Sequence, residues 1–231
     1  MKSLLTIGVF ISSALISTTV FANQSEINTI ELASMQLNEQ TLSQAIESNQ
    51  GYTQALANYR LALSQNIHGK QQAAITTLHN AIQNLEKVVN ENSNDDESWA
   101  LLSQCYGLKI AFQPMLGATY GPKAGEALQK AQTLNPNNPR AALFKGIMLF
   151  NTPEMYGGSK TLALKAFDQA ISLFADDKNS GKHWGEAEAY VWRGLSYQAI
   201  NKNPQAKADF EMALQLSPDF SWAKMLLKNH S

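Results

Sequence analysis

The chain has 231 residues, of which 44% are apolar and 16% charged, with a formal net charge of −1 and a single cysteine. This length and composition allow a sizeable buried core and argue against intrinsic disorder. One cysteine excludes a small fold held together by internal disulfides. The near-neutral balance, without a run of Lys or Arg, argues against a nucleic-acid partner.

Residues 1–22 have the layout of a secretory signal peptide. Lys2 gives a positive start, residues 3–21 carry no charge, and Ala22 ends an A-x-A-like group of small residues. We expect cleavage after Ala22, so that residues 23–231 form a single domain in the periplasm, with secretion as the alternative. A retained anchor is the competing interpretation, because the uncharged span is about long enough to cross a bilayer. We expect no membrane span after signal cleavage.

Helical periodicity follows this segment. Residues 27–46 are typical of one helix or two short ones. Apolar residues at spacings of three and four then predict two helices, which form a first repeat-like unit over residues 52–89. Residues 90–97 make a polar break.

Two further units follow over residues 96–136 and 139–175. Apolar and small residues recur in both at matching positions, which predicts one helical hairpin in each. Compared with the last unit, both have extra residues between their two helices, within residues 110–122 and 151–158. We expect these insertions to be loops that emerge at the same edge of the array.

The last unit, residues 187–220, has the clearest pattern. Its first helix carries Tyr190-x2-Arg193-Gly194-x2-Tyr197, and its second carries Ala206-x3-Phe210 before Pro218. This pattern resembles the tetratricopeptide repeat (TPR), although Arg193 stands where Leu is usual. In such a repeat, small residues let two helices approach closely and aromatic residues fill the space between them.

The TPR resemblance implies an all-α fold, a right-handed superhelix of antiparallel helix hairpins with a concave groove lined by the first helix of each unit. It also implies a protein or peptide partner, with self-association as a further possibility. Both the groove and the two insertions are candidate binding regions, because loops carry function and exposed apolar patches mark contacts. The groove candidates are Arg140, Leu143, Ile147, Phe150, Val191, Leu195 and Gln198, and the insertion candidates are Met115, Tyr120, Met155 and Tyr156. The competing interpretation is that the C-terminal helix or a second subunit fills the groove and that the insertions only pack.

Motifs for catalysis or cofactor binding are missing from the sequence. The four histidines form no zinc-binding pattern, and we find no P-loop, no dinucleotide-binding glycine motif and no nucleophile elbow. We therefore expect no enzyme activity, no cofactor and no metal.

Two functions fit these observations. The first is a non-enzymatic periplasmic scaffold that binds a protein or peptide through the groove and the loop edge. The alternative is an accessory component of a solute transport system that binds a small hydrophobic ligand or a solute-binding protein. That alternative rests on the helical layout and on Tyr156-Gly157-Gly158, which resemble the T-component family of TRAP transporters.

Overall fold

The computed structural model describes residues 24–229, and within them the chain forms helices and turns without any strand. The all-α prediction is confirmed, while the predicted signal peptide lies outside the described residues. In chain order the α-helices are α1 (Gln24–Met35), α2 (Glu39–Ser48), α3 (Gly51–Ile67), α4 (Gln71–Glu91), α5 (Asp96–Phe112), α6 (Gly117–Leu134), α7 (Pro139–Asn151), α8 (Lys160–Phe174), α9 (Glu186–Ala199), α10 (Asn203–Leu216) and α11 (Ser221–Lys228). Three short 3₁₀ turns, η1 (Pro114–Leu116), η2 (Glu154–Tyr156) and η3 (Asp177–Asn179), lie between them.

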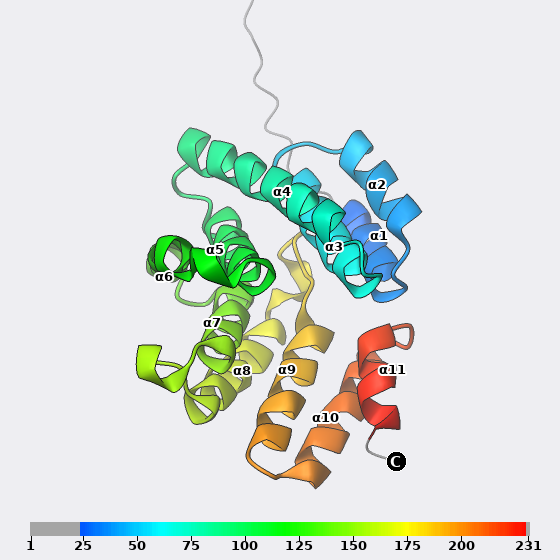
Figure 1. Ribbon diagram of the computed structural model, residues 1–231. Coiled ribbons are helices and arrows are strands. Elements are labelled where there is room, and N and C mark those ends of the chain that lie inside the picture. Colours follow the sequence, from blue (N-terminus) through cyan, green and yellow to red (C-terminus); the bar gives the residue numbers. More distant parts are fainter. Residues whose placement is uncertain (1–23, 230–231) are drawn as a thin grey trace, which may run out of the picture.

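Four antiparallel hairpins, α3–α4, α5–α6, α7–α8 and α9–α10, stack into an array. Helices α1 and α2 pack at its N-terminal end, and α11 packs on α10 at its C-terminal end. The array curves so strongly that α1 and α11 come to the same side of the molecule (Figure 1). Gln36, just after α1, donates a hydrogen bond to the carboxylate of Asp219, just before α11, at 3.1 Å.

Side-chain caps begin several of the helices. Asn38, Asp95, Asn138 and Ser159 each accept a hydrogen bond from a backbone N–H in the first turn of the following helix. These bonds satisfy donors that have no partner inside the helix. The polar residues between the hydrophobic runs therefore decide where α2, α5, α7 and α8 begin.

Small residues bring the two helices of a hairpin together. A Cβ atom on Gly194 of α9 would lie 2.5 Å from the ring of Phe210 on α10, and one on Gly146 of α7 would overlap the ring of Phe167 on α8. Ser103 holds the matching position on α5, and its hydroxyl donates to the carbonyl of Ala124 on α6 at 2.8 Å. The spacing of small and aromatic residues in the sequence thus corresponds to real helix contacts.

Of the two insertions, residues 151–158 form the expected loop, whereas residues 110–122 do not. Most of residues 110–122 is helical, because α5 continues to Phe112 and α6 begins at Gly117, with only η1 between them. Pro122 lies in the second turn of α6, inside the helix, where it cannot donate the helical hydrogen bond to the carbonyl of Ala118. Within 151–158, η2 makes a tight turn that Gly157 leaves with a φ of 91°. Inside residues 24–229, no helix has both the length and the apolar character needed to cross a membrane.

Candidate protein-binding surface

The inner face of the array is the side that the first helices of the hairpins line. The chain itself fills one half of this face. The segment between α8 and α9 turns inward and places Trp184 against Phe144 of α7, with ring centroids 6.0 Å apart. The indole N–H of Trp184 donates to the hydroxyl of Tyr52, at the start of α3, at 2.9 Å. Trp184 is 3% exposed. This part of the predicted groove is therefore closed.

Helix α1 also crosses the inner face. Its Glu31 accepts two hydrogen bonds from Arg60 of α3, at 2.8 and 2.7 Å. The same guanidinium lies 3.0 Å from a carboxylate oxygen of Glu188 on α9 and 4.9 Å from the ring of Trp184. One buried arginine thus ties together α1, α3 and α9.

A second buried arginine holds in place the segment between α8 and α9, which we call the inner segment. Arg140 of α7 donates to both carboxylate oxygens of Glu97 on α5, at 2.6 Å each, and to both oxygens of Asp177, at 2.7 and 3.0 Å. Burial alone lowers the pKa of Arg140, but Glu97 and Asp177 outweigh this effect and raise the pKa above its usual value. The guanidinium therefore stays charged at physiological pH.

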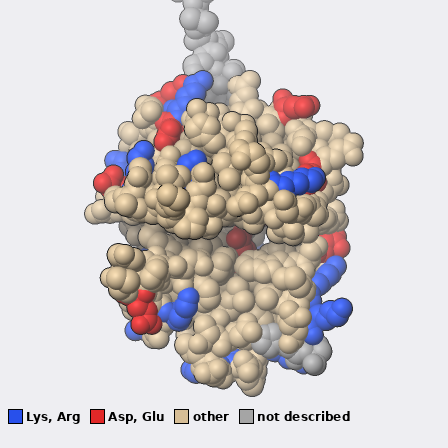
Figure 2. Space-filling view, viewed as in Figure 1, with Lys and Arg blue, Asp and Glu red and all other residues tan. Residues whose placement is uncertain are grey.

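The other half of the inner face carries an aromatic patch. It consists of Phe150 on α7, Trp192 on α9, Trp222 on α11 and Phe220 before it, all partly exposed. The ring of Trp192 lies 5.5 Å from Phe150 and 5.3 Å from Trp222, edge to face in both cases. The indole N–H of Trp192 is buried and has no hydrogen-bond partner among the described residues. In Figure 2, the face in view has a hollow near its middle with an acidic group at its floor.

The structure separates the predicted groove residues into two groups. Arg140, Leu143, Ile147 and Val191 lie in the core, and their burial removes them as surface contacts in this arrangement. Arg140 and Leu143 are covered because Trp184 and Gly185 occupy space that a simple superhelix leaves open, whereas Val191 packs in an apolar cluster with residues of α10 and α11. Phe150 and Leu195 are partly exposed and Gln198 is exposed, so these three side chains stay accessible.

The predicted insertion residues also differ among themselves. Met115 in η1 is 97% exposed, and Met155 and Tyr156 in η2 are 81% and 73% exposed. Tyr120 instead packs on the side of α6, where its ring lies 5.5 Å from the ring of Tyr106. Three of the four side chains therefore project freely from ordered turns.

Sequence reasoning missed Trp192 and Trp222 as members of the inner surface. The available signal was their position on the first helix of a unit and on the C-terminal helix, where aromatic side chains face the neighbouring first helix. Nothing in the sequence indicated that Trp184 fills the groove. No group of three or more His, Cys, Asp or Glu side chains suited to a metal ion occurs within residues 24–229.

Comparison with known proteins supports the repeat assignment. The family model for the tetratricopeptide repeat matches residues 187–220. The structure is similar to that of TTC0263, a thermophilic TPR protein from Thermus thermophilus, with a TM-score of 0.53 and 18% identity over 88% of this chain and 98% of that one. It is also similar to the HusA haemophore from Porphyromonas gingivalis, with a TM-score of 0.55 and 23% identity over 76% of this chain and 91% of that one. No curated protein matches the chain.

At these identities the two structures show a shared fold. The match at residues 187–220 covers α9 and α10, the hairpin in which Gly194 meets Phe210. That fold is typical of scaffolds for protein interactions. The chain thus carries a tetratricopeptide repeat at residues 187–220 and has the fold of the tetratricopeptide repeat proteins.

Proposed function

We propose that this protein is an exported, non-enzymatic scaffold that binds a segment of another protein on the aromatic patch of its inner face. The observation that carries the proposal is the arrangement of Phe150, Trp192 and Trp222, three partly exposed rings on three successive inner helices. Aromatic rings supply large contact area at a low cost in side-chain entropy, and they dominate many protein interfaces.

The residues that flank Trp192 on α9 support a protein ligand. Leu195 extends the apolar surface along α9, while Gln198 gives a polar rim at the end of that helix. An apolar centre with a polar rim is the usual anatomy of a protein interface.

Export to the periplasm is part of the same proposal and rests on the layout of residues 1–22. Fractionation of producing cells, combined with mass measurement of the chain, tests both cleavage after Ala22 and the compartment. A chain of full mass that stays in the cytoplasm would contradict the export.

Site-specific photo-crosslinking tests the binding surface. A photoreactive residue replaces Gln198 beside the patch, and in a matched control it replaces Lys207, which is exposed on the outer side of α10. We expect a defined protein adduct from position 198 alone, and we expect Trp222→Ala to abolish it while circular dichroism stays unchanged. Adducts of equal yield at both positions, or an adduct that survives Trp222→Ala, would overturn the proposal. An adduct of the chain with itself would assign the patch to self-association.

A further inference from the structure

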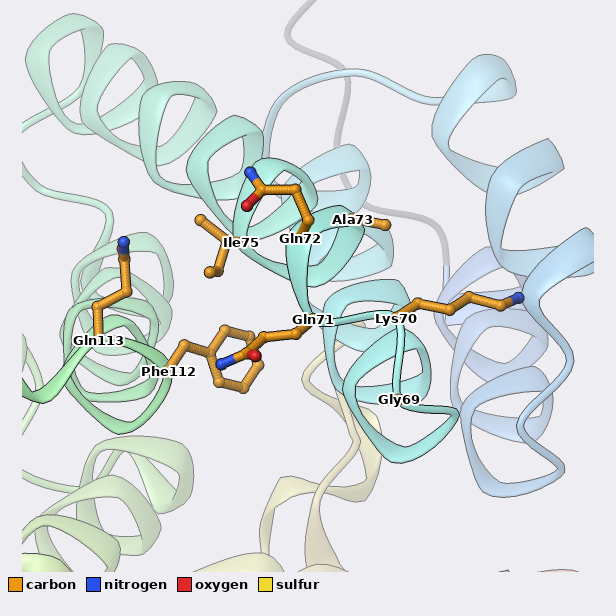
Figure 3. Close-up of a pocket in the computed structure, with 8 residues that line it drawn as sticks. All are labelled: Gly69, Lys70, Gln71, Gln72, Ala73, Ile75, Phe112 and Gln113. Carbon is orange, nitrogen blue, oxygen red and sulfur yellow. The ribbon is translucent and has the colours of Figure 1, made fainter.

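A second surface, separate from the aromatic patch, lies where the hairpins turn. Helices in the array alternate in direction, so α3, α5 and α7 all end at one edge. We define the turn edge as residues 66–73, 109–123 and 151–165. The first two of these segments lie together, since the start of α4 and the end of α5 border a shallow hollow of about 660 Å³ that Phe112 and Ile75 help to line (Figure 3).

Large apolar side chains project from this edge on ordered backbone. Met115, Met155 and Tyr156 are the three most exposed large apolar residues of the described chain, and Ile67, at the end of α3, is 60% exposed. The η2 turn is fixed by hydrogen bonds from the N–H groups of Tyr156 and Gly158 to the carbonyl of Pro153. Exposed Met and Tyr side chains on a rigid turn lower the solubility of a protein. Exposed apolar groups of this kind therefore indicate a contact surface.

The turn edge is also positively charged. Its three segments contain five lysines and one carboxylate, Glu154. The opposite edge, residues 90–97, 134–140 and 174–186, contains seven carboxylates, two lysines and Arg140, which pairs with Glu97 and Asp177. Glu39 of α2 neutralises Lys70 through a 2.8 Å ion pair. The other four, Lys109, Lys123, Lys160 and Lys165, form no salt bridge within the part of the chain that the structure describes.

The lysines lie in the same segments as the exposed side chains of Met115, Met155 and Tyr156, which we call the apolar tips. Lys109 and Lys123 lie 5.5 and 5.4 Å from the ring centre of Tyr120, in the same segment as Met115. Lys160 donates to the carbonyl of Phe150 and lies over its ring, which holds its ammonium at the end of α7. Apolar tips flanked by lysines are typical of proteins that lie on a membrane surface, because the tips enter the interface while the ammonium groups meet anionic headgroups.

We propose that the turn edge docks on the surface of an anionic lipid bilayer, independently of any partner on the aromatic patch. The projecting shape favours a bilayer over a folded acidic protein, since Met115 and Met155 stand out from the surface. Tyr156 suits the headgroup level, where amphipathic rings gather. The acidic opposite edge would then face away from the membrane.

An environment-sensitive fluorophore at single positions tests this directly. Met155→Cys and Met115→Cys in the full chain place it on the turn edge, and Met212→Cys on α10 is the matched control. Labelling is selective because Cys105 is buried, and burial also raises the pKa of its thiol. With vesicles of 70% phosphatidylcholine and 30% phosphatidylglycerol, we expect a blue shift at positions 155 and 115 and none at 212. Vesicles of phosphatidylcholine alone should give no shift.

Charge variants make the test quantitative. Lys123→Gln with Lys165→Gln removes two exposed turn-edge lysines, and at about 1 kcal/mol for each lysine near an anionic surface we expect roughly 30-fold weaker vesicle binding. Lys130→Gln with Lys207→Gln, at exposed positions elsewhere, should change binding less than twofold. An equal shift at position 212, an equal response to neutral vesicles, or a shift produced only by an acidic protein fraction would overturn the proposal.

Discussion

Trp184 donates its indole N–H to the hydroxyl of Tyr52 at 2.9 Å, across 132 residues of sequence. This hydrogen bond joins the segment before α9 to the start of α3 and closes the inner face at that point. Both side chains are buried, and the burial of Tyr52 raises the pKa of its hydroxyl well above the usual value. The phenol therefore stays protonated and available as a partner for the indole.

The Trp184–Tyr52 contact predicts a measurable coupling. Trp184→Phe removes the donor and should lower the free energy of unfolding by about 1–3 kcal/mol. Trp184→Ala should cost more, about 3–5 kcal/mol, because it also leaves a cavity. In a double-mutant cycle with Tyr52→Phe, measured by urea denaturation, the two conservative changes should be less than additive. Strict additivity would mean that the hydrogen bond contributes nothing to stability.

Arg140 predicts a second large effect on stability. Arg140→Met leaves Glu97 and Asp177 without their shared cation, and breaking a buried ion pair in this way costs about 3–5 kcal/mol. Arg193 is the matched control, because it pairs with Asp168 and Asp209 but is partly exposed. Arg193→Met should therefore cost clearly less in the same urea titration. Equal losses of unfolding free energy in the two variants would show that burial does not make the loss of the Arg140 ion pairs more costly.

Substitutions at two glycines test the close approach of the helices. We expect them to change the free energy of unfolding in opposite directions. Gly194→Ala brings a methyl group against Phe210 and should lower the free energy of unfolding by about 1–3 kcal/mol. Gly125 of α6 has open space around it, so Gly125→Ala should raise that free energy by about 0.5–1 kcal/mol through helix propensity. Thermal unfolding of both variants checks the difference, and Phe210→Leu should partly rescue Gly194→Ala. Destabilisation of equal size at both glycines would count against the packing argument.

Glu39 should make a pH-dependent contribution to the free energy of unfolding. Hydrogen bonds from Lys70 and His68 lower the pKa of the Glu39 carboxyl. A carboxyl with a lowered folded-state pKa stabilises the protein above its unfolded-state pKa, and this stability is lost as pH falls through the folded-state pKa. Glu39→Gln should thus lower the free energy of unfolding at pH 7 by less than about 1 kcal/mol, since the pair is near the surface. Urea titrations should show the difference shrinking as the pH falls below 4.5, the ordinary pKa of a glutamate, and a difference that does not change with pH would rule out the ion pair as its source.

The repeat core could be predicted from the sequence, whereas its closure could not. Gly194, Ala206 and Phe210 lie close together along the chain, and their spacing reports directly on one hairpin. The contacts of Trp184 with Tyr52 and of Arg60 with Glu188 join residues more than 120 positions apart, and no local periodicity encodes them.

The insertion at residues 110–122 was misjudged for a different reason. Pro114, Gly117, Gly121 and Pro122 favour a loop when they are counted as helix breakers. The structure continues α6 through Gly121 and Pro122, because the buried face of α6 packs along α5 and this packing outweighs the local propensities. Part of the candidate site, Phe150, Leu195 and Gln198, followed from the repeat frame, but Trp192 and Trp222 needed the three-dimensional arrangement of α7, α9 and α11.

The central claim is that the inner face has a closed half at Trp184 and a binding half at Trp192 and Trp222. The most direct measurement is fluorine NMR of the protein labelled with 5-fluorotryptophan, whose four resonances are assigned through Trp→Phe variants. The protein captured at position 198 is then titrated in. We predict that the signals of Trp192 and Trp222 shift while those of Trp184 and Trp99 stay in place. A shift of Trp184 with the inner segment displaced, or no shift of Trp192, would contradict the account.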